Sequence, residues 1–197
     1  ARIRVMQLFD AAGLRLQPPD FPSRVQVEVT NRCNLRCIMC TRNQMTRSTG
    51  DMTPETFRRV ADEVCTEPGC VLAMYFLGEP LLNPCLEDMV RYLAERADPA
   101  LVFGIQTNGM LLGADRARRL LEAGLRSFAF SLDALEGDLE RIRPGARYPQ
   151  IEQNILGLIE TARQMGISNL RVDISKLCDD PNADEVKRFK ERWEGKV

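Results

Sequence analysis

The cysteines Cys33, Cys37 and Cys40 lie close together in this 197-residue chain, with the spacing C-x3-C-x2-C. They lie just after the strand-like run Val-Gln-Val-Glu-Val at 25–29. Three soft thiolates from one loop can hold three corners of a 4Fe–4S cube, whereas most such cubes take four protein thiolates. No fourth cysteine lies nearby in the sequence. The pattern therefore predicts a cluster whose fourth iron is open to a substrate or a cofactor.

The same thiols allow two other interpretations. A structural zinc ion needs four ligands, usually from paired C-x2-C motifs or with histidine. The sequence contains no histidine, and the other cysteines are scattered singly, at Cys65, Cys70, Cys85 and Cys178. An iron–sulfur module for electron transfer or redox sensing is the second alternative, and it would tend to have a fourth thiolate close by. The residues favour an iron–sulfur cluster over zinc.

The cysteine spacing differs from the ferredoxin run C-x2-C-x2-C and resembles that of the radical S-adenosylmethionine (SAM) superfamily. The resemblance implies that Cys33, Cys37 and Cys40 are metal ligands and that the cofactors are a 4Fe–4S cluster and SAM. In this superfamily one electron from the cluster cleaves SAM to a 5′-deoxyadenosyl radical, which removes a hydrogen atom from the substrate. The implied protein is an enzyme of the oxidoreductase kind, acting on a peptide, a sugar or a small natural-product intermediate.

A second stretch, Leu77-Gly78-Glu79-Pro80, resembles the superfamily's Gly-Gly-Glu-Pro motif, with leucine in place of the first glycine. The resemblance implies that Gly78 and Glu79 bind the amino group of SAM. Glycine permits close backbone approach, and a carboxylate accepts hydrogen bonds from an ammonium group. Met39 stands where the superfamily usually has an aromatic residue. Its soft, apolar side chain suits a purine face, which predicts a contact with the adenine of SAM.

Two later motifs also end strand-like runs. Thr107 and Asn108 belong to the sequence Gln-Thr-Asn-Gly, which is either a plain turn or part of the SAM pocket. Ser131 is expected to contact SAM through its hydroxyl group. Asp133 is either a second SAM contact or the N-cap of the following helix. Arg143 is expected to pair with the SAM carboxylate, because a guanidinium group suits bidentate contacts.

Two features bear on the subfamily and on the chemistry. The segment 140–145 and the pair Asn154-Ile155 are most similar to SPASM-type or twitch-type members of the superfamily.

Cys178 follows the fifth strand-like run and is the single candidate for a catalytic group, because a thiol there could donate or accept a hydrogen atom. A lone cysteine is, however, more often a small buried hydrophobic residue.

Composition limits the other function classes. The chain is 44% hydrophobic and 28% charged, as in ordinary globular proteins. Its formal net charge of −1 gives no reason to expect a nucleic acid or an anionic membrane as partner. The absence of histidine excludes His-based zinc catalysis and Ser–His hydrolases. Seven cysteines without a disulfide spacing favour a reducing cytoplasm. The expected partners are a substrate and an external reductant such as flavodoxin or ferredoxin.

Strand-like runs alternate with amphipathic stretches, which predicts an α/β fold with a parallel sheet. The runs are Arg24–Thr30, Cys70–Leu77, Leu101–Gln106, Arg126–Leu132 and Leu170–Ser175. Helices are expected from Thr53-Pro54-Glu55, where a hydroxyl N-cap precedes proline, and over Pro84–Ala97, Ala114–Ala123, Tyr148–Met165 and Asn182–Trp193; the first dozen residues have rough helical spacing. A Rossmann sheet and a β/α barrel both fit this alternation, although no G-x-G-x-x-G follows the first strand.

The motifs all fall at strand ends, where β/α barrels carry their active sites. We therefore predict a partial (β/α) barrel of the radical SAM type with about five to six parallel βα units. The predicted organisation is an N-terminal extension over 1–22 and a radical SAM core over 23–197. Because the sequence ends where a sixth strand would begin, which would leave an exposed sheet edge, the C-terminal part of the core is expected to be missing.

Overall fold

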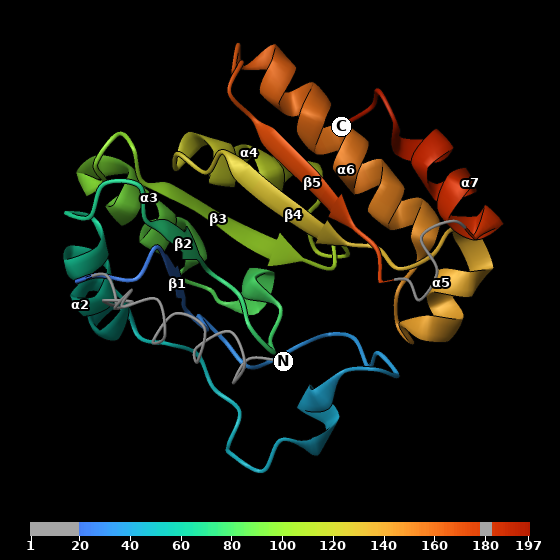
Figure 1. Ribbon diagram of the computed structural model, residues 1–197, viewed down its shortest axis with the longest axis horizontal. Coiled ribbons are helices and arrows are strands. Elements are labelled where there is room, and N and C mark those ends of the chain that lie inside the picture. The colour runs from blue at the N-terminus through green and yellow to red at the C-terminus, as the bar shows by residue number, and fades with distance from the viewer. Residues whose placement is uncertain (1–19, 178–182) are drawn as a thin grey trace, which may run out of the picture.

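The computed structural model describes residues 20–177 and 183–197. In these ranges the chain forms one parallel sheet of five strands in the order β1-β2-β3-β4-β5. The strands are β1 (Arg24–Gln26), β2 (Val71–Ala73), β3 (Val102–Thr107), β4 (Ser127–Ser131) and β5 (Arg171–Ser175). Figure 1 shows β3, β4 and β5 side by side and pointing the same way. The predicted helical spacing of the first dozen residues, and Cys178, lie outside the described residues.

The strand order decides between the two sheet architectures that the sequence allowed. Each crossover moves the chain by one strand in the same direction, since the order is sequential. Because βαβ crossovers are right-handed, such an order places successive helices on the same face of the sheet. A doubly wound Rossmann sheet instead reverses its direction at a switch point. The predicted partial β/α barrel is therefore confirmed.

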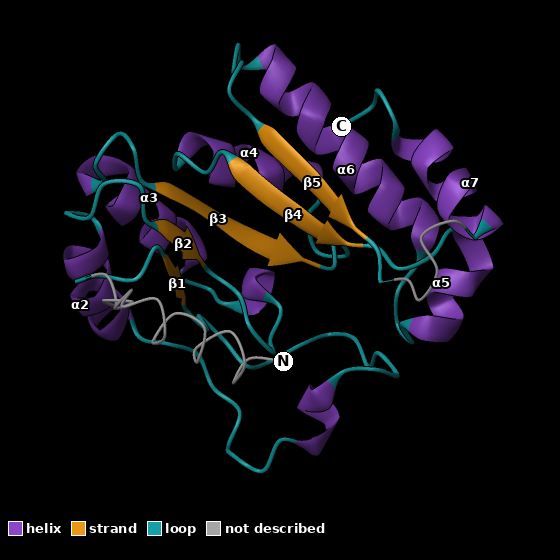
Figure 2. Cartoon of the chain, viewed as in Figure 1, coloured by secondary structure: helices purple, strands orange, loops and turns teal. Residues whose placement is uncertain are grey.

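Helices fill the connections between the strands, as Figure 2 shows in purple. They are α2 (Pro54–Val64), α3 (Leu86–Arg96), α4 (Ala114–Glu122), α5 (Glu136–Ile142), α6 (Tyr148–Gln164) and α7 (Asp184–Trp193), with the short 3-10 helices η1 (Thr41–Gln44) and η2 (Pro80–Leu82). The start of α2 is as predicted: the Thr53 hydroxyl oxygen accepts a hydrogen bond from the Thr56 N–H, 3.2 Å away, and Pro54 opens the helix. None of the described helices is both long and apolar enough to span a lipid bilayer.

The core lies between the sheet and its helices. The inward side chains of the central strands, among them Leu72, Ile105 and Phe128, are fully buried. Helix α6 contributes Ile151, Ile155 and Leu158, which recur at the spacing of one helix face. This packing fixes the direction of each strand and hence the place where each strand-end loop emerges.

Three elements differ clearly from the sequence prediction. The second strand, predicted over Cys70–Leu77, is formed only by Val71–Ala73. The first strand is shorter than expected, because only Arg24–Gln26 pairs with β2, and Thr30 forms an isolated antiparallel bridge with Asp51. Helix α5 was assumed in the N-cap alternative for Asp133 but was given no predicted range, because only Leu139 on it is buried and the remainder is mostly charged or polar. A helix of seven residues whose apolar contacts are Leu139 and the partly buried Ile142 leaves too short a periodic pattern in the sequence.

Candidate functional site

A cavity of about 170 Å³ opens at the carboxyl ends of β2, β3 and β4. It is lined by the three closely spaced cysteines and by residues of three strand-end loops: Cys33, Leu35, Cys37, Cys40, Tyr75, Phe76, Leu77, Gly78, Glu79, Gln106, Thr107, Asn108, Ser131 and Arg143. The carboxyl ends of parallel strands share one edge of a sheet, so residues distant in sequence meet there. The predicted motifs thus converge on a single cavity.

The cysteine loop lies against the segment that follows α5. The backbone N–H of Arg36 donates to the Pro144 carbonyl oxygen at 3.1 Å, and that of Ile38 donates to the Ile142 carbonyl oxygen at 3.0 Å. Leu35, which precedes Arg36, and Cys37, which lies between Arg36 and Ile38, are both buried. The pairing orients Cys37 inward and holds the loop in place from a segment about a hundred residues away in sequence.

The sulfur atoms face hydrogen-bond donors. The Leu35 N–H lies 3.5 Å from Cys33 Sγ, the Asn108 side-chain amide 4.0 Å from the same sulfur, and Arg143 Nη1 3.7 Å from Cys37 Sγ. Burial raises the pKa of the Cys33 and Cys37 thiols, while the Arg143 guanidinium acts in the opposite direction on Cys37. Such donors stabilise thiolates, which are the form that binds metal.

This donor set fits the cluster that the sequence predicts. A 4Fe–4S cube takes one thiolate at each iron corner, and three cysteines line the cavity. Among residues 20–177 and 183–197, no group of three His, Cys, Asp or Glu side chains is close enough to share one metal ion. The three sulfurs are separate groups around one cavity, and the six cysteines in the described ranges are free thiols.

Glu79 is buried, and its carboxylate accepts three hydrogen bonds. Thr107 Oγ1 donates to Oε1 at 2.6 Å, the Leu81 N–H to Oε1 at 3.2 Å, and the Asn108 N–H to Oε2 at 2.8 Å. Burial raises the pKa of the Glu79 carboxyl, while these donors act in the opposite direction. The side chain therefore joins the loop after β2 to the loop after β3, and this positions both of them beside the cysteines.

Replacement of Glu79 by glutamine is expected to destabilise the protein by about 1–3 kcal/mol. The three partners are all donors, and the amide nitrogen of glutamine cannot accept from any of them. Urea denaturation measures the effect, with Glu122→Gln on the exposed surface of α4 as the control, for which a change within about 0.5 kcal/mol is expected. Equal stability of the two variants would contradict this role of Glu79.

The remaining polar residues of the cavity bond to one another across strands. Gln106 Nε2 donates to Ser131 Oγ at 2.6 Å, which links the ends of β3 and β4. The side-chain amide of Asn108 donates to Asn34 Oδ1 at 2.9 Å, which links the end of β3 to the cysteine loop. Gln106, Asn108 and Ser131 line the cavity and form its polar wall at the strand ends, and Asn34 fastens this wall to the cysteine loop.

Asp133 lies behind the cavity rather than in its lining. Its Oδ2 pairs with Arg143, at 2.8 Å from Nε and 2.6 Å from Nη2, and its Oδ1 accepts from the Leu177 N–H at 3.0 Å. The Lys176 ammonium donates to the Asp133 carbonyl oxygen. The N-cap alternative is wrong, since Leu135 is the N-cap of α5 and has no side-chain cap. Asp133 holds Arg143 in place from the ends of β4 and β5.

Some residues are placed differently from the expectation. Met39 is 42% exposed and is not among the residues that line the cavity. Tyr75 and Phe76 do line it, although the sequence analysis did not single them out. Their position directly before the Leu-Gly-Glu-Pro stretch was the available signal, because residues at the end of a buried parallel strand face the active-site edge of the sheet.

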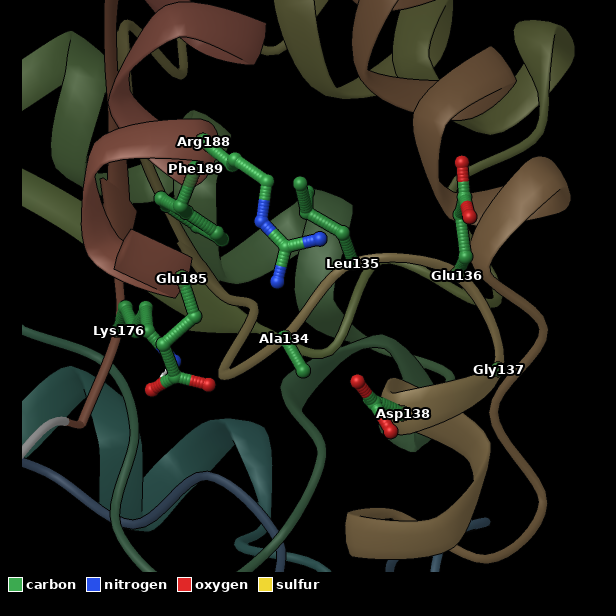
Figure 3. A pocket seen from close by; sticks show the side chains of 9 residues that line it. All are labelled: Ala134, Leu135, Glu136, Gly137, Asp138, Lys176, Glu185, Arg188 and Phe189. Atoms are coloured by element: carbon green, nitrogen blue, oxygen red, sulfur yellow. Dashed lines mark ion pairs between the residues drawn. The ribbon is translucent and has the colours of Figure 1, made fainter. Parts of the chain in front are cut away.

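A larger cavity, of about 370 Å³, lies between residues 134–138, at the start of α5, and helix α7. Figure 3 shows the Arg188 side chain reaching across it towards Ala134 and Leu135. Lys176 Nζ pairs with Glu185 Oε1 at 3.1 Å on its wall. Its acidic and basic side chains are mixed, and all of them except Lys176 are exposed. This cavity lacks the concentrated sulfur and polar groups of the cysteine cavity.

The fold is a partial β/α barrel, and three cysteines and three polar loops meet at the carboxyl edge of its sheet. This combination is typical of barrel domains that bind a cofactor. The sequence profile of the Radical SAM superfamily matches residues 27–192, and the chain belongs to that superfamily. Its members are enzymes that use radical chemistry, with a 4Fe–4S cluster and SAM as cofactors.

Individual relatives share the domain but are longer than this chain. A probable GTP 3′,8-cyclase of Methanocella arvoryzae is 31% identical over 195 residues, which cover 96% of this chain and 57% of the relative. A tungsten-containing aldehyde ferredoxin oxidoreductase cofactor-modifying protein of Pyrococcus furiosus is 37% identical over 111 residues, which cover 55% of this chain and 30% of the relative. The crystal structure of Streptococcus suis SuiB bound to S-adenosylmethionine has a TM-score of 0.72 at 13% identity, covering 99% of this chain and 48% of SuiB. That last likeness concerns the fold alone.

Proposed function

We propose that this chain is the SAM-cleaving core of a radical SAM enzyme. One observation carries the proposal: three cysteines and the polar residues of three strand-end loops line the same cavity. A 4Fe–4S cluster bound there would supply one electron to SAM, and the resulting 5′-deoxyadenosyl radical would remove a hydrogen atom from a substrate. The chain spans between 30% and 57% of the length of the relatives described above, so the activity of a whole protein is part of the proposal.

Cys33, Cys37 and Cys40 are the proposed cluster ligands. Arg143 has its Nε and Nη2 on Asp133, which leaves Nη1 directed at the cavity side near Cys37. A guanidinium group held in this way suits the carboxylate of SAM. In this assignment Asp133 positions Arg143 and does not itself bind the cofactor.

The loops after the central strands are the proposed binding surface for the remainder of SAM. Gly78 offers backbone groups to the amino end, and Glu79 holds that loop in register with Thr107 and Asn108. Ser131 offers a hydroxyl group. Met39, exposed next to the third cysteine, is the proposed apolar cover of the adenine.

The substrate is proposed to be a peptide, a sugar or a small natural-product intermediate. GTP joins these candidates because the relative from Methanocella arvoryzae, which is similar over almost the whole chain, is described as a probable GTP 3′,8-cyclase. A flavodoxin or ferredoxin is the proposed reductant.

Anaerobic reconstitution with iron and sulfide, followed by electron paramagnetic resonance with and without SAM, tests the proposal. The expected result is a reduced-cluster signal that SAM alters, together with release of 5′-deoxyadenosine under dithionite. A signal that SAM leaves unchanged, without 5′-deoxyadenosine, would contradict the enzyme and favour an iron–sulfur electron carrier.

A further inference from the structure

The cysteine loop has an outer surface that the cavity does not use. Residues 35–38 alternate in burial: Leu35 and Cys37 are buried, whereas Arg36 and Ile38 are exposed, Ile38 to 69%. The alternation follows from the pairing with 142–144, because an extended backbone directs successive side chains to opposite sides. Arg36 and Ile38 therefore flank Cys37 on the solvent side of the loop, one residue from a proposed cluster ligand.

This region is also basic in a chain that is otherwise slightly acidic. Residues 31–50 contain four arginines and no Asp or Glu, whereas the whole chain has a formal charge of −1. Two of the four are neutralised, since Arg32 pairs with Asp51 and Arg47 with Glu28. Arg42 donates only to a backbone carbonyl, and Arg36 forms no side-chain hydrogen bond or ion pair within the described ranges. Uncompensated positive charge thus lies on the cysteine loop itself.

The loop is accessible as well as charged. Helix η1, which follows Cys40, has no buried residue. In Figure 1 the light-blue and cyan segment that contains it stands away from the sheet. The exposed aliphatic side chain of Ile38, on the same side of the loop as the unpaired Arg36 guanidinium, has the composition of a contact surface rather than of a folded core.

We propose that the outer surface of the cysteine loop, formed by the exposed side chains of Arg36 and Ile38, is the docking site of a small acidic electron-transfer protein. The proposal rests on the proposed function, because it requires a cluster on the neighbouring cysteines. The donor protein loses one electron and the cluster gains one electron; no bond forms or breaks. Ile38 supplies the apolar centre of the contact, and Arg36 attracts the negative surface of the donor before contact.

Charge complementarity favours this occupant over a basic or neutral protein. Oppositely charged surfaces accelerate diffusional encounter, and salt screens the effect. Docking at this surface also brings the donor to the solvent side of the cysteine loop. Only the loop itself then separates the donor from the cavity that Cys37 lines. The opposite wall of the cavity remains available to SAM and substrate.

Stopped-flow reduction of the reconstituted protein by an acidic flavodoxin, itself reduced in advance, tests the proposal. At low ionic strength the charge reversal Arg36→Glu is expected to slow cluster reduction by about tenfold, and Ile38→Asp is a second variant at the same surface. Arg118→Glu, an equal charge change on the exposed side of α4, is the matched control and is expected to behave as wild type. Calorimetric titration with oxidised flavodoxin provides a readout that is independent of turnover.

Three outcomes decide the matter. Slower reduction and weaker binding in Arg36→Glu and Ile38→Asp, with the Arg36→Glu difference vanishing at roughly 0.5 M salt, would support the docking site. Wild-type rates in both variants, or equal slowing by Arg118→Glu, would overturn it. Dithionite reduction needs no docking and should be equal in all variants; if dithionite reduces no cluster even in the wild type, the proposed function fails and the docking site fails with it.

Discussion

Replacement of Cys37 by alanine is expected to abolish 5′-deoxyadenosine formation. Cys37 lies at the centre of the cysteine loop, faces the cavity and has Arg143 Nη1 3.7 Å from its sulfur. Its loss would leave a cluster with two protein ligands, and the thiolate cannot be supplied by another cysteine of the cavity lining. Iron content and the visible absorbance of the reconstituted protein, followed by chromatography of the SAM cleavage products, measure the effect.

Cys85→Ala is the matched control for this experiment. Cys85 is partly buried, is remote in sequence from the cysteine loop and does not line the cavity. This variant is expected to bind iron and to cleave SAM as the wild type does. If Cys37→Ala still cleaves SAM, the assignment of the cluster ligands is wrong.

Replacement of Gly78 by alanine is expected to destabilise the protein by about 3 kcal/mol, at the upper end of the usual range for overpacking. A Cβ atom at this position would lie 1.9 Å from the Thr30 carbonyl oxygen and 2.9 Å from that of Arg32. Both are backbone atoms, which cannot rotate away as a side chain can. The loop that carries Glu79 would have to move away from residues 30–32, which lead into the cysteine loop, so SAM binding is expected to be lost as well.

Urea denaturation and calorimetric SAM titration measure these two effects. Gly157→Ala in α6 is the control, because a Cβ there would have no atom within 4 Å. Alanine loses less conformational entropy than glycine in a helix, so this variant is expected to gain about 0.5–1 kcal/mol. A Gly78→Ala protein with wild-type stability would contradict the close approach of the two loops.

The helices and strands were largely predictable, because the sequence pattern that indicates each of them lies within one short segment. The Thr-Pro-Glu start of α2 and the apolar runs of the five strands are properties of short segments, and each proved to form the expected type of element. The strand order was not predictable in this way, because it depends on which edges meet in space. Helix α5 was given no predicted range for a related reason: with only Leu139 buried, it is stabilised by its place in the structure more than by its own pattern.

The sequence predicted which residues form the site, but not which of them contact a ligand and which position their neighbours. Glu79 was expected to contact SAM, and Asp133 either to contact SAM or to cap the following helix, yet each carboxylate already accepts hydrogen bonds from other parts of the protein. Sequence alone cannot distinguish a carboxylate that faces a ligand from one that holds the ligand's neighbours, because the difference lies in partners that are distant in sequence. The contact between Asp133 and Leu177 spans more than forty residues.

The pairing of the cysteine loop with residues 142–144 has a consequence for biosynthesis. During translation the three cysteines leave the ribosome about a hundred residues before the segment that orders them. Until α5 and its C-terminal segment have been made, the loop lacks the backbone pairing that turns Arg36 and Ile38 outward and Cys37 inward. Insertion of the proposed cluster therefore requires the second half of the domain. A nascent chain stalled before residue 142 is expected to bind no cluster and to show no visible absorbance.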